Sequence, residues 1–261
     1  MKITVTHVGT ATVLLEIGGL RLLTDPAFDP APAEYRHDPV VLRSTAGPAL
    51  GVEALPPLDA VLLSHDEHPD NLDAGGRALL ERLPASTPVL TTVGGAVRLG
   101  GSAVGLAPWT THTVTAGERT LRVTGTPGVH GPVGEVTGFV IEVPGEEETV
   151  YLSGDTVHVP ELEAIGRRFR IGVALLHLGA ARIDAFGGGE LITMDGRQAA
   201  ALTRSLGAHT VVPLHYSSWE HFTEGREETT ARFAEAGLAD RLHWLTPGEP
   251  TALETARAVL R

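Results

Sequence analysis

The sequence of 261 residues contains no cysteine. This absence excludes disulfide bonds, thiolate metal sites and a cysteine nucleophile. Any bound metal ion must therefore be held by imidazole or carboxylate groups. Both kinds of group are plentiful, because the chain has 12 histidines and 32 acidic residues.

Basic residues and long apolar runs are also scarce. Lys and Arg together number 20, and the formal net charge is −12, so we do not expect a nucleic-acid partner, which needs a basic surface. No apolar run reaches the roughly 18 residues of a membrane-spanning helix. The N-terminus lacks a basic segment followed by an apolar one, as a secretion signal would have. We therefore expect a cytoplasmic protein without an integral membrane segment.

The chain is predicted to form one α/β domain over residues 1–261. Hydrophobic residues make up 42% of it, which suffices for a sizeable core. Residues 12–17 and 20–24 are predicted to form a hairpin, residues 25–57 a long loop, and residues 72–83 a helix. Apolar strand-like runs and helical patterns alternate along the rest of the chain without a repeat or a linker. This pattern is typical of buried sheets covered by outer helices.

Four of the predicted strands end in residue types that bind metal ions. Each of these side chains follows an apolar run and stands at the beginning of a loop or a helix. Imidazoles and carboxylates that converge from separate strand ends are the ligands that Zn²⁺ or Mn²⁺ requires. The candidate ligands are, in chain order, His65, His68, Asp70, His130, Asp155 and His215.

Each of these segments also has an ordinary structural interpretation. Asp70 could cap a helix, His130 could be a loop histidine, and Asp155 could belong to a turn with Gly154. No single segment decides between the two interpretations. Their occurrence in this order, each at the end of a strand, favours a shared metal site.

The order of these motifs resembles that of the metallo-β-lactamase superfamily, whose pattern is H-x-H-x-D-H followed by a His, an Asp and a His. The resemblance covers essentially the whole chain. Within the superfamily, the chain looks most similar to the branch that contains ascorbate-6-phosphate lactonase and the N-acyl phosphatidylethanolamine phospholipase D type. The resemblance implies an αββα four-layer sandwich with hydrolase activity and with metals at the sheet edges. Its supporting segments include HVGTAT at 7–12, LTDP at 23–26 and SGDT at 153–156.

The first motif departs from the family pattern in its spacing. Counting back from Asp70 in the family's two-residue steps gives His68 and then Asp66, whereas the end of the strand gives His65. Either one residue is inserted and His65 is the first ligand, or Asp66 replaces a histidine. We favour the insertion because His65 stands where the strand ends. Glu67 is the remaining candidate.

A second departure is Asn71, which stands where the family pattern has histidine. An amide oxygen is a weaker ligand than imidazole for Zn²⁺, although less is lost for a harder ion such as Mn²⁺. We therefore expect unequal sites, with one ion held firmly and a second one bound weakly or absent.

The resemblance implies a role for each candidate residue. Asp155 would bridge from a first site to a second one, which Asp70 and His215 would complete. A metal-bound water would attack the substrate, and Asp70 would orient this water or accept its proton. The first site would consist of three imidazoles, those of His65, His68 and His130.

The predicted function is metal-dependent hydrolysis of a small-molecule lactone, ester, amide or phosphodiester. One or two ions, Zn²⁺ or Mn²⁺, would be bound per chain, and a homo-oligomer is compatible with the sequence. The alternative is a degenerate, metal-poor member of the family that acts as a binding or scaffolding protein. Asn71 and the irregular first motif are the support for this alternative, and metal analysis separates the two.

Overall fold

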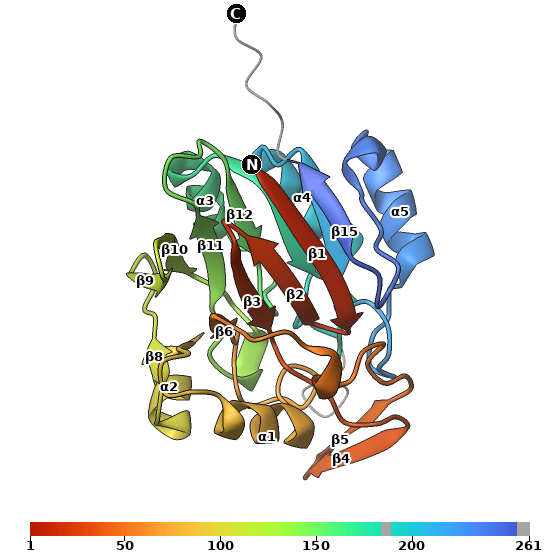
Figure 1. Cartoon of the computed structure of the whole chain (residues 1–261). Helices are drawn as coiled ribbons and strands as arrows, with labels where there is room; N and C mark the ends of the chain where they lie inside the picture. Colours follow the sequence, from red (N-terminus) through yellow and green to blue (C-terminus); the bar gives the residue numbers. More distant parts are fainter. Residues whose placement is uncertain (184–188, 255–261) are drawn as a thin grey trace, which may run out of the picture.

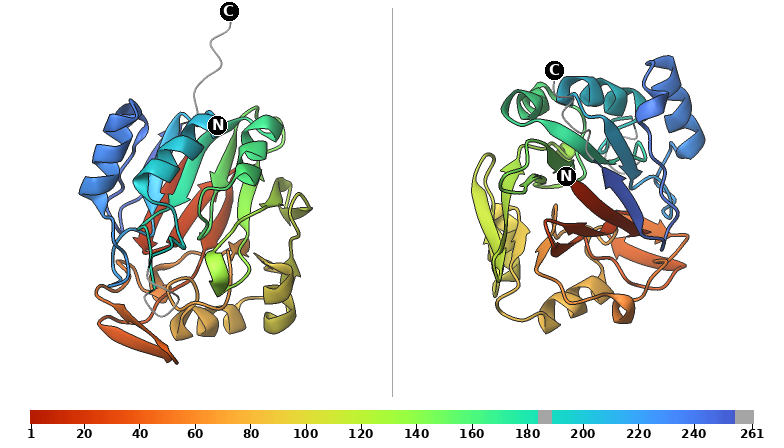
Figure 2. Two further views of the ribbon diagram at one scale, coloured as in Figure 1. Left: turned by 180° about the vertical axis from the view of Figure 1, so that it is seen from behind. Right: turned by 45° about the horizontal axis from the view of Figure 1, so that its top comes forward.

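The computed structural model describes residues 1–183 and 189–254. Two large β-sheets pack against each other, and helices cover their outer faces (Figures 1 and 2). The first sheet has the strand order β15-β1-β2-β3-β6-β7-β8. Its strands are β1 (Lys2–Gly9), β2 (Thr12–Ile17), β3 (Leu20–Thr24), β6 (Ala60–Leu62), β7 (Val89–Thr91), β8 (Ala103–Gly105) and β15 (Thr251–Glu254).

The second sheet has the order β14-β13-β12-β11-β10-β9. Strands β12, β13 and β14 are parallel, so their carboxyl ends meet at one edge of the sheet. All residues of β12 and β13 are buried, as expected for strands that are covered on both faces. The strands are β9 (Thr111–Ala116), β10 (Arg119–Thr126), β11 (Gly138–Glu142), β12 (Thr149–Leu152), β13 (Ile171–His177) and β14 (Thr210–Leu214).

Three apolar clusters define the layers. The largest lies between the sheets and includes Leu15 of β2 and Val173 of β13. The second packs α3, α4 and α5 onto the second sheet, and the third packs α1 onto the first. The four-layer αββα sandwich implied by the resemblance is therefore confirmed. The helices are α1 (Ala74–Arg82), α2 (Val93–Leu99), α3 (Glu163–Arg168), α4 (Gly196–Leu206) and α5 (Arg226–Glu235), with short 3₁₀ helices at Val52–Ala54, Gly131–Val133, Pro160–Leu162 and Ala239–Arg241.

The prediction of a long loop over residues 25–57 is wrong in part. This segment contains the antiparallel hairpin of β4 (Ala33–His37) and β5 (Val40–Ser44), which lies outside the two large sheets. Each strand has five residues and a short alternation, with Tyr35 opposite Leu42 on one face and the cross-strand ion pair of Glu34 and Arg43 (2.9 Å) on the other. The prediction from the sequence missed this short alternation. The predicted hairpin at 12–17 and 20–24 is confirmed.

The helix that follows the first metal motif begins at a buried cap. Asp73 accepts a hydrogen bond from the Gly76 amide (2.7 Å) and another from the Asp29 amide (2.6 Å). We expect Asp73→Ala to lower the free energy of unfolding by about 1–2 kcal/mol, because both amides lose their acceptor. Chemical denaturation measures this loss. Asp240→Ala, in an exposed 3₁₀ helix, is the control, and equal stability of the two variants would contradict the prediction.

Candidate metal centre

The predicted ligands meet at one edge of the sandwich because each follows the end of a strand. The segment after β6 carries His65, His68 and Asp70, and β10, β12 and β14 lead into the other three. Within each of two groups, the potential ligand atoms lie within 4.8 Å of one another. The first group is His65, His68 and His130, and the second is Asp70, Asp155 and His215.

The first group is a set of three imidazoles whose nitrogen atoms converge. His68 Nδ1 lies 2.8 Å from His65 Nε2 and 3.2 Å from His130 Nε2. Ligand atoms around a tetrahedral ion with bonds of 2.0–2.1 Å are separated by about 3.3 Å, so this spacing fits a metal ion such as Zn²⁺. His130 Nδ1 donates to the Ile192 carbonyl (2.7 Å), which leaves Nε2 with its lone pair toward the group.

Burial favours the neutral form of two of these imidazoles, those of His65 and His130. It lowers the pKa of His65 well below its ordinary value and lowers the pKa of His130 to about 4. Neighbouring imidazoles add to the effect, because two protonated rings at this distance would repel each other. The lone pairs are therefore available to a cation at neutral pH, and the residues present fit a metal ion.

The spacing of the first motif is explained by the direction of its side chains. Asp66 points away from the imidazoles and forms a bidentate ion pair with Arg98, with Nη2 at 2.6 Å and Nε at 3.0–3.1 Å. Glu67 also contacts Arg98 (3.0 Å). His65 faces the imidazole group instead, and its Nδ1 lies 2.9 Å from Ser64 Oγ. This arrangement favours the interpretation with one inserted residue.

The second group combines two carboxylates with one imidazole. His215 Nε2 lies 3.2 Å from Asp155 Oδ2 and 3.3 Å from Asp70 Oδ2. Burial opposes the protonation of His215, but the charge of Asp155 and the hydrogen bond with Asp70 outweigh it and raise the pKa of His215 to about 9. Burial likewise opposes ionisation of both carboxylates, but the imidazoles around them hold the pKa of Asp70 and of Asp155 well below the usual range. Two ionised carboxylates in a buried site favour a divalent cation.

The backbone conformation determines the direction of two of these side chains, those of Asp155 and His215. Gly154 has a φ of +62°, and a Cβ there would lie 2.7 Å from the Thr137 carbonyl oxygen. Glycine is therefore required at this turn, and the turn directs Asp155 into the site. His215 itself has a φ of +55°, a left-handed conformation that is uncommon for a residue other than glycine and is concentrated at functional sites.

A further histidine contacts the carboxylate oxygen of Asp155 that does not face His215. His177, at the end of β13, is fully buried and its Nδ1 lies 2.8 Å from Asp155 Oδ1. Asp155 Oδ2 is then left to face His215. On the other side of His177, Asp25 accepts a hydrogen bond from the Ser64 amide (2.7 Å), and burial raises the pKa of Asp25 to about 7.

The two groups face one small cavity with a larger pocket beside it. The cavity has a volume of about 20 Å³, which is room for about one water molecule. The neighbouring pocket of about 380 Å³ lies between the β5 segment and the chain after β14. Leu42, Ile183 and His221 line both spaces, so the pocket adjoins the candidate metal centre.

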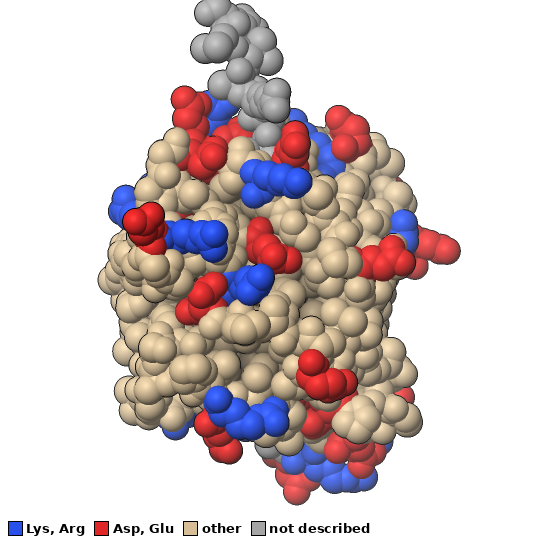
Figure 3. Space-filling view, in the orientation of Figure 1, with Lys and Arg blue, Asp and Glu red and all other residues tan. Residues whose placement is uncertain are grey.

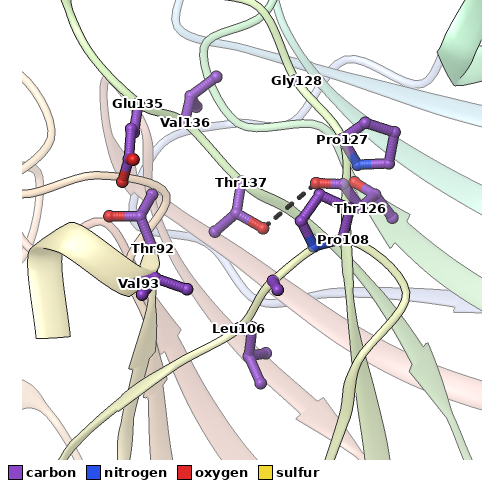
Figure 4. A pocket seen from close by; sticks show the side chains of 11 residues that line it. Thr92, Val93, Leu106, Pro108, Thr126, Pro127, Gly128, Glu135, Val136 and Thr137 are labelled. Carbon is purple, nitrogen blue, oxygen red and sulfur yellow. Dashed lines mark hydrogen bonds between the residues drawn. The ribbon is translucent and has the colours of Figure 1, made fainter.

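Figure 4 shows another pocket, which has a volume of about 270 Å³. It is lined by the segments that flank His130, and none of the candidate ligands contributes to it. Thr137 donates to the Thr126 carbonyl across its floor (3.3 Å), and Glu135 accepts from the amide of Gly94 in α2 (3.2 Å). These contacts support the loop that carries His130.

From the sequence, His221 is a candidate wall of a pocket after His215, together with Trp219 and Phe222, and is not among the predicted ligands. Its Nε2 lies 3.3 Å from Asp70 Oδ2, and its side chain is only 11% exposed. The run of aromatic and histidine residues after His215 was the available signal. No family spacing marks this position, so the contact became visible only in the folded chain.

Comparison with known proteins identifies the family. The sequence model described as "Beta-lactamase superfamily domain" matches residues 20–216. The chain belongs to this superfamily. A UPF0173 metal-dependent hydrolase of Pyrobaculum aerophilum is 30% identical over 247 residues, which span 92% of this chain and 96% of that protein. A relative with the same description from Pyrobaculum arsenaticum is 27% identical over 259 residues, with the same two coverages.

Solved structures show the same fold. The isothiocyanate hydrolase from Delia radicum gut bacteria has a TM-score of 0.80 at 24% identity and covers 96% of this chain and 99% of its own. Igni18, a metallo hydrolase from Ignicoccus hospitalis, has a TM-score of 0.72 at 24% identity and covers 97% and 99%. These structures show the metallo-β-lactamase fold. The description shared by the Pyrobaculum relatives identifies this superfamily member as a metal-dependent hydrolase.

Proposed function

We propose that this superfamily member hydrolyses a small molecule by means of a metal-activated water. The observation that carries the proposal is the pair of ligand groups that face one cavity. The three imidazoles of the first group would hold one ion, and Asp70, Asp155 and His215 would hold a second, with Asp155 as the bridge. When bound, a divalent ion of the Zn²⁺ or Mn²⁺ type supplies Lewis-acid activation of water and of the substrate.

Asp70 is the residue that we assign to the attacking water. Its carboxylate is buried and contacts both His215 and His221. Hydrogen bonds with His215 and His221 hold the pKa of Asp70 well below the usual range, so its carboxylate is ionised and can accept a hydrogen bond. We therefore propose that Asp70 orients the water or accepts its proton.

The adjoining 380 Å³ pocket is the proposed substrate site. Apolar side chains such as Val41, Leu42 and Ile183 line it together with Arg43 and Arg182. Such a lining suits a small molecule with an apolar part and a polar or anionic group. A lactone, ester, amide or phosphodiester meets this description. We also propose, from the resemblance of the sequence, that the chain belongs to the branch that contains ascorbate-6-phosphate lactonase and the N-acyl phosphatidylethanolamine phospholipase D type.

The surface favours a small molecule over nucleic acid. On the face seen in Figure 3, the described Lys and Arg side chains are interspersed with acidic ones, without a continuous basic strip. In the described ranges, no helix is long and apolar enough to cross a membrane. A cytoplasmic location and the oligomeric state stay predictions from the sequence.

Removal and return of metal test the proposed function. The purified protein should contain at least one equivalent of metal by elemental analysis and should hydrolyse a member of a panel of lactones, esters, amides and phosphodiesters. Chelation should abolish this activity, and Zn²⁺ or Mn²⁺ should restore it, because the neutral imidazoles offer their lone pairs to the returning ion. Folded protein that takes up no metal and hydrolyses no substrate would favour the scaffolding alternative, which neither the site nor the relatives support.

A further inference from the structure

Three side chains stand between the candidate metal centre and the adjoining pocket. Leu42, Ile183 and His221 line both the cavity of about 20 Å³ at the metal centre and the pocket of about 380 Å³ beside it. We call the space between these side chains the opening. We propose that Leu42 sets the width of the opening, so that the enzyme accepts substrates that are unbranched next to the bond that is hydrolysed. This inference deepens the proposed function and rests on it.

The cavity at the metal centre leaves little room for a substrate. Its volume is that of about one water molecule, and ions held by the two ligand groups would occupy part of it. Apart from the candidate ligands, its lining is mainly apolar and includes Leu42, Ala181 and Ile192. Most of a substrate must therefore stay in the larger pocket, and only the reacting group can pass through the opening to the metal centre.

Leu42 is buried without being part of the hydrophobic core. Its exposed fraction is 7%, but among the described residues it belongs to none of the three apolar clusters that hold the layers together. Ala181 and Ile192, which line the same cavity, are also buried outside these clusters. The burial of Leu42 is thus explained by its place at the cavity, and a shorter side chain there would widen the opening and leave the core intact.

The backbone on both sides of Leu42 is attached to the segment that follows β14. The Glu220 amide donates to the Arg43 carbonyl (3.1 Å), and the Thr45 amide donates to the Ser218 carbonyl (2.7 Å). This segment also carries His221, so two walls of the opening are joined by hydrogen bonds of the main chain. Walls that are held in this way resist displacement by a bulky group, and the width of the opening is therefore set by the size of the side chains.

The other two walls are less suited to a test of this width. His221 Nε2 lies 3.3 Å from Asp70 Oδ2, so a change at His221 would also disturb a candidate ligand. Ile183 follows Arg182, whose amide donates to the His221 carbonyl (3.3 Å). Leu42 reaches the opening from the separate β4–β5 hairpin. Its side chain can be altered without a change in the contacts of Asp70.

Two hydroxamates that differ only in branching measure the width of the opening. A hydroxamate coordinates a divalent ion through its two oxygen atoms, whichever bond the enzyme hydrolyses. Protein loaded with Co²⁺ is titrated with acetohydroxamate, which has a methyl group next to its carbonyl, and with pivalohydroxamate, which has a tert-butyl group there. The visible spectrum of Co²⁺ reports binding. We expect acetohydroxamate to bind at least ~10-fold more tightly, because one methylene group in an apolar site changes discrimination by ~10–200-fold.

Variants of Leu42 should change this preference in opposite directions. Leu42→Ala should lower the preference for acetohydroxamate by about tenfold, whereas Leu42→Phe should weaken the binding of both compounds. Leu42→Val is the milder replacement if Leu42→Ala does not fold, and Co²⁺ stoichiometry and thermal unfolding check each variant. The matched control is Val97→Ala on α2, where the side chain is 80% exposed and lines neither space. The control should keep the preference of the unaltered protein.

The outcomes separate this inference from the function on which it rests. Equal binding of both hydroxamates by the unaltered protein, or an unchanged preference in the folded Leu42 variants, would overturn the role of Leu42. Protein that binds Co²⁺ but neither hydroxamate would show that the opening does not lead to the metal, and the inference would fail while a metal-binding protein remains. Protein that binds no Co²⁺ would overturn the proposed function and this inference together.

Discussion

Asp155→Ala is expected to remove bound metal and activity together while the fold survives. Asp155 is buried at the end of β12, and its Oδ2 lies 3.2 Å from His215 Nε2. Its negative charge also favours the protonated form of His130 in the first group, so it acts on both groups. Loss of this carboxylate leaves the charge of any bound cation poorly neutralised in a buried site.

Metal content and enzyme activity measure this effect. Elemental analysis should show less than one tightly held ion per chain, and hydrolysis by the variant should fall to the level of chelated protein. Circular dichroism and thermal unfolding should report a folded chain, because the layers around the site are held by apolar packing. The matched control is Asp240→Ala, in an exposed 3₁₀ helix. Unchanged metal stoichiometry in Asp155→Ala would refute its assignment as a ligand.

His65→Ala should weaken metal binding far more than Asp66→Ala. The imidazole of His65 faces His68 at 2.8 Å, whereas the carboxylate of Asp66 is occupied by Arg98. We expect His65→Ala to reduce the affinity of the first site by more than the ~10–100-fold seen for residues behind ligands. Asp66→Ala should change it only several-fold, through the position of the neighbouring backbone.

Competition with a chromophoric chelator measures the metal affinity of the His65→Ala and Asp66→Ala variants. Asp66→Ala should instead lower stability, since it leaves the Arg98 guanidinium without its bidentate partner; that side chain is 43% exposed, so the loss should be small. Arg98→Ala is the companion variant and should bind metal as Asp66→Ala does. The reverse ranking of His65 and Asp66 would show that no residue is inserted in the first motif.

The strands and helices that could be predicted are those with a local signal. The hairpin of β2 and β3 follows a glycine pair between apolar runs, and α4 begins at Asp195, whose side chain accepts from the Gln198 amide (2.7 Å). The β4–β5 hairpin was not predicted in this way, because the alternation in its two five-residue strands is short and because contacts with distant segments stabilise it. One of these contacts is an isolated antiparallel β-bridge between Ser44 and Trp219.

In the candidate site, too, some features could be predicted from the sequence and others could not. The ligand types were predictable because each stands in the segment that follows a strand, and strands that run in the same direction end at a common edge. The direction of Asp66 was not predictable, because its partner Arg98 is 32 positions away along the chain. The contact of His221 with Asp70 depends in the same way on a loop that is fastened to β5 and to the segment after β13.

The sequence by itself determined which chemistry is available to this protein. Without cysteine, a metal can be held only by imidazole and carboxylate groups, and the strand ends supply both. Tertiary structure alone decided how these groups are combined. Asp70 and His215 are 145 positions apart, and their meeting depends on the packing of two sheets. Distances of about 3 Å between ligand atoms are set by this packing and not by any local pattern, since coordination and hydrogen bonding depend on separation in space.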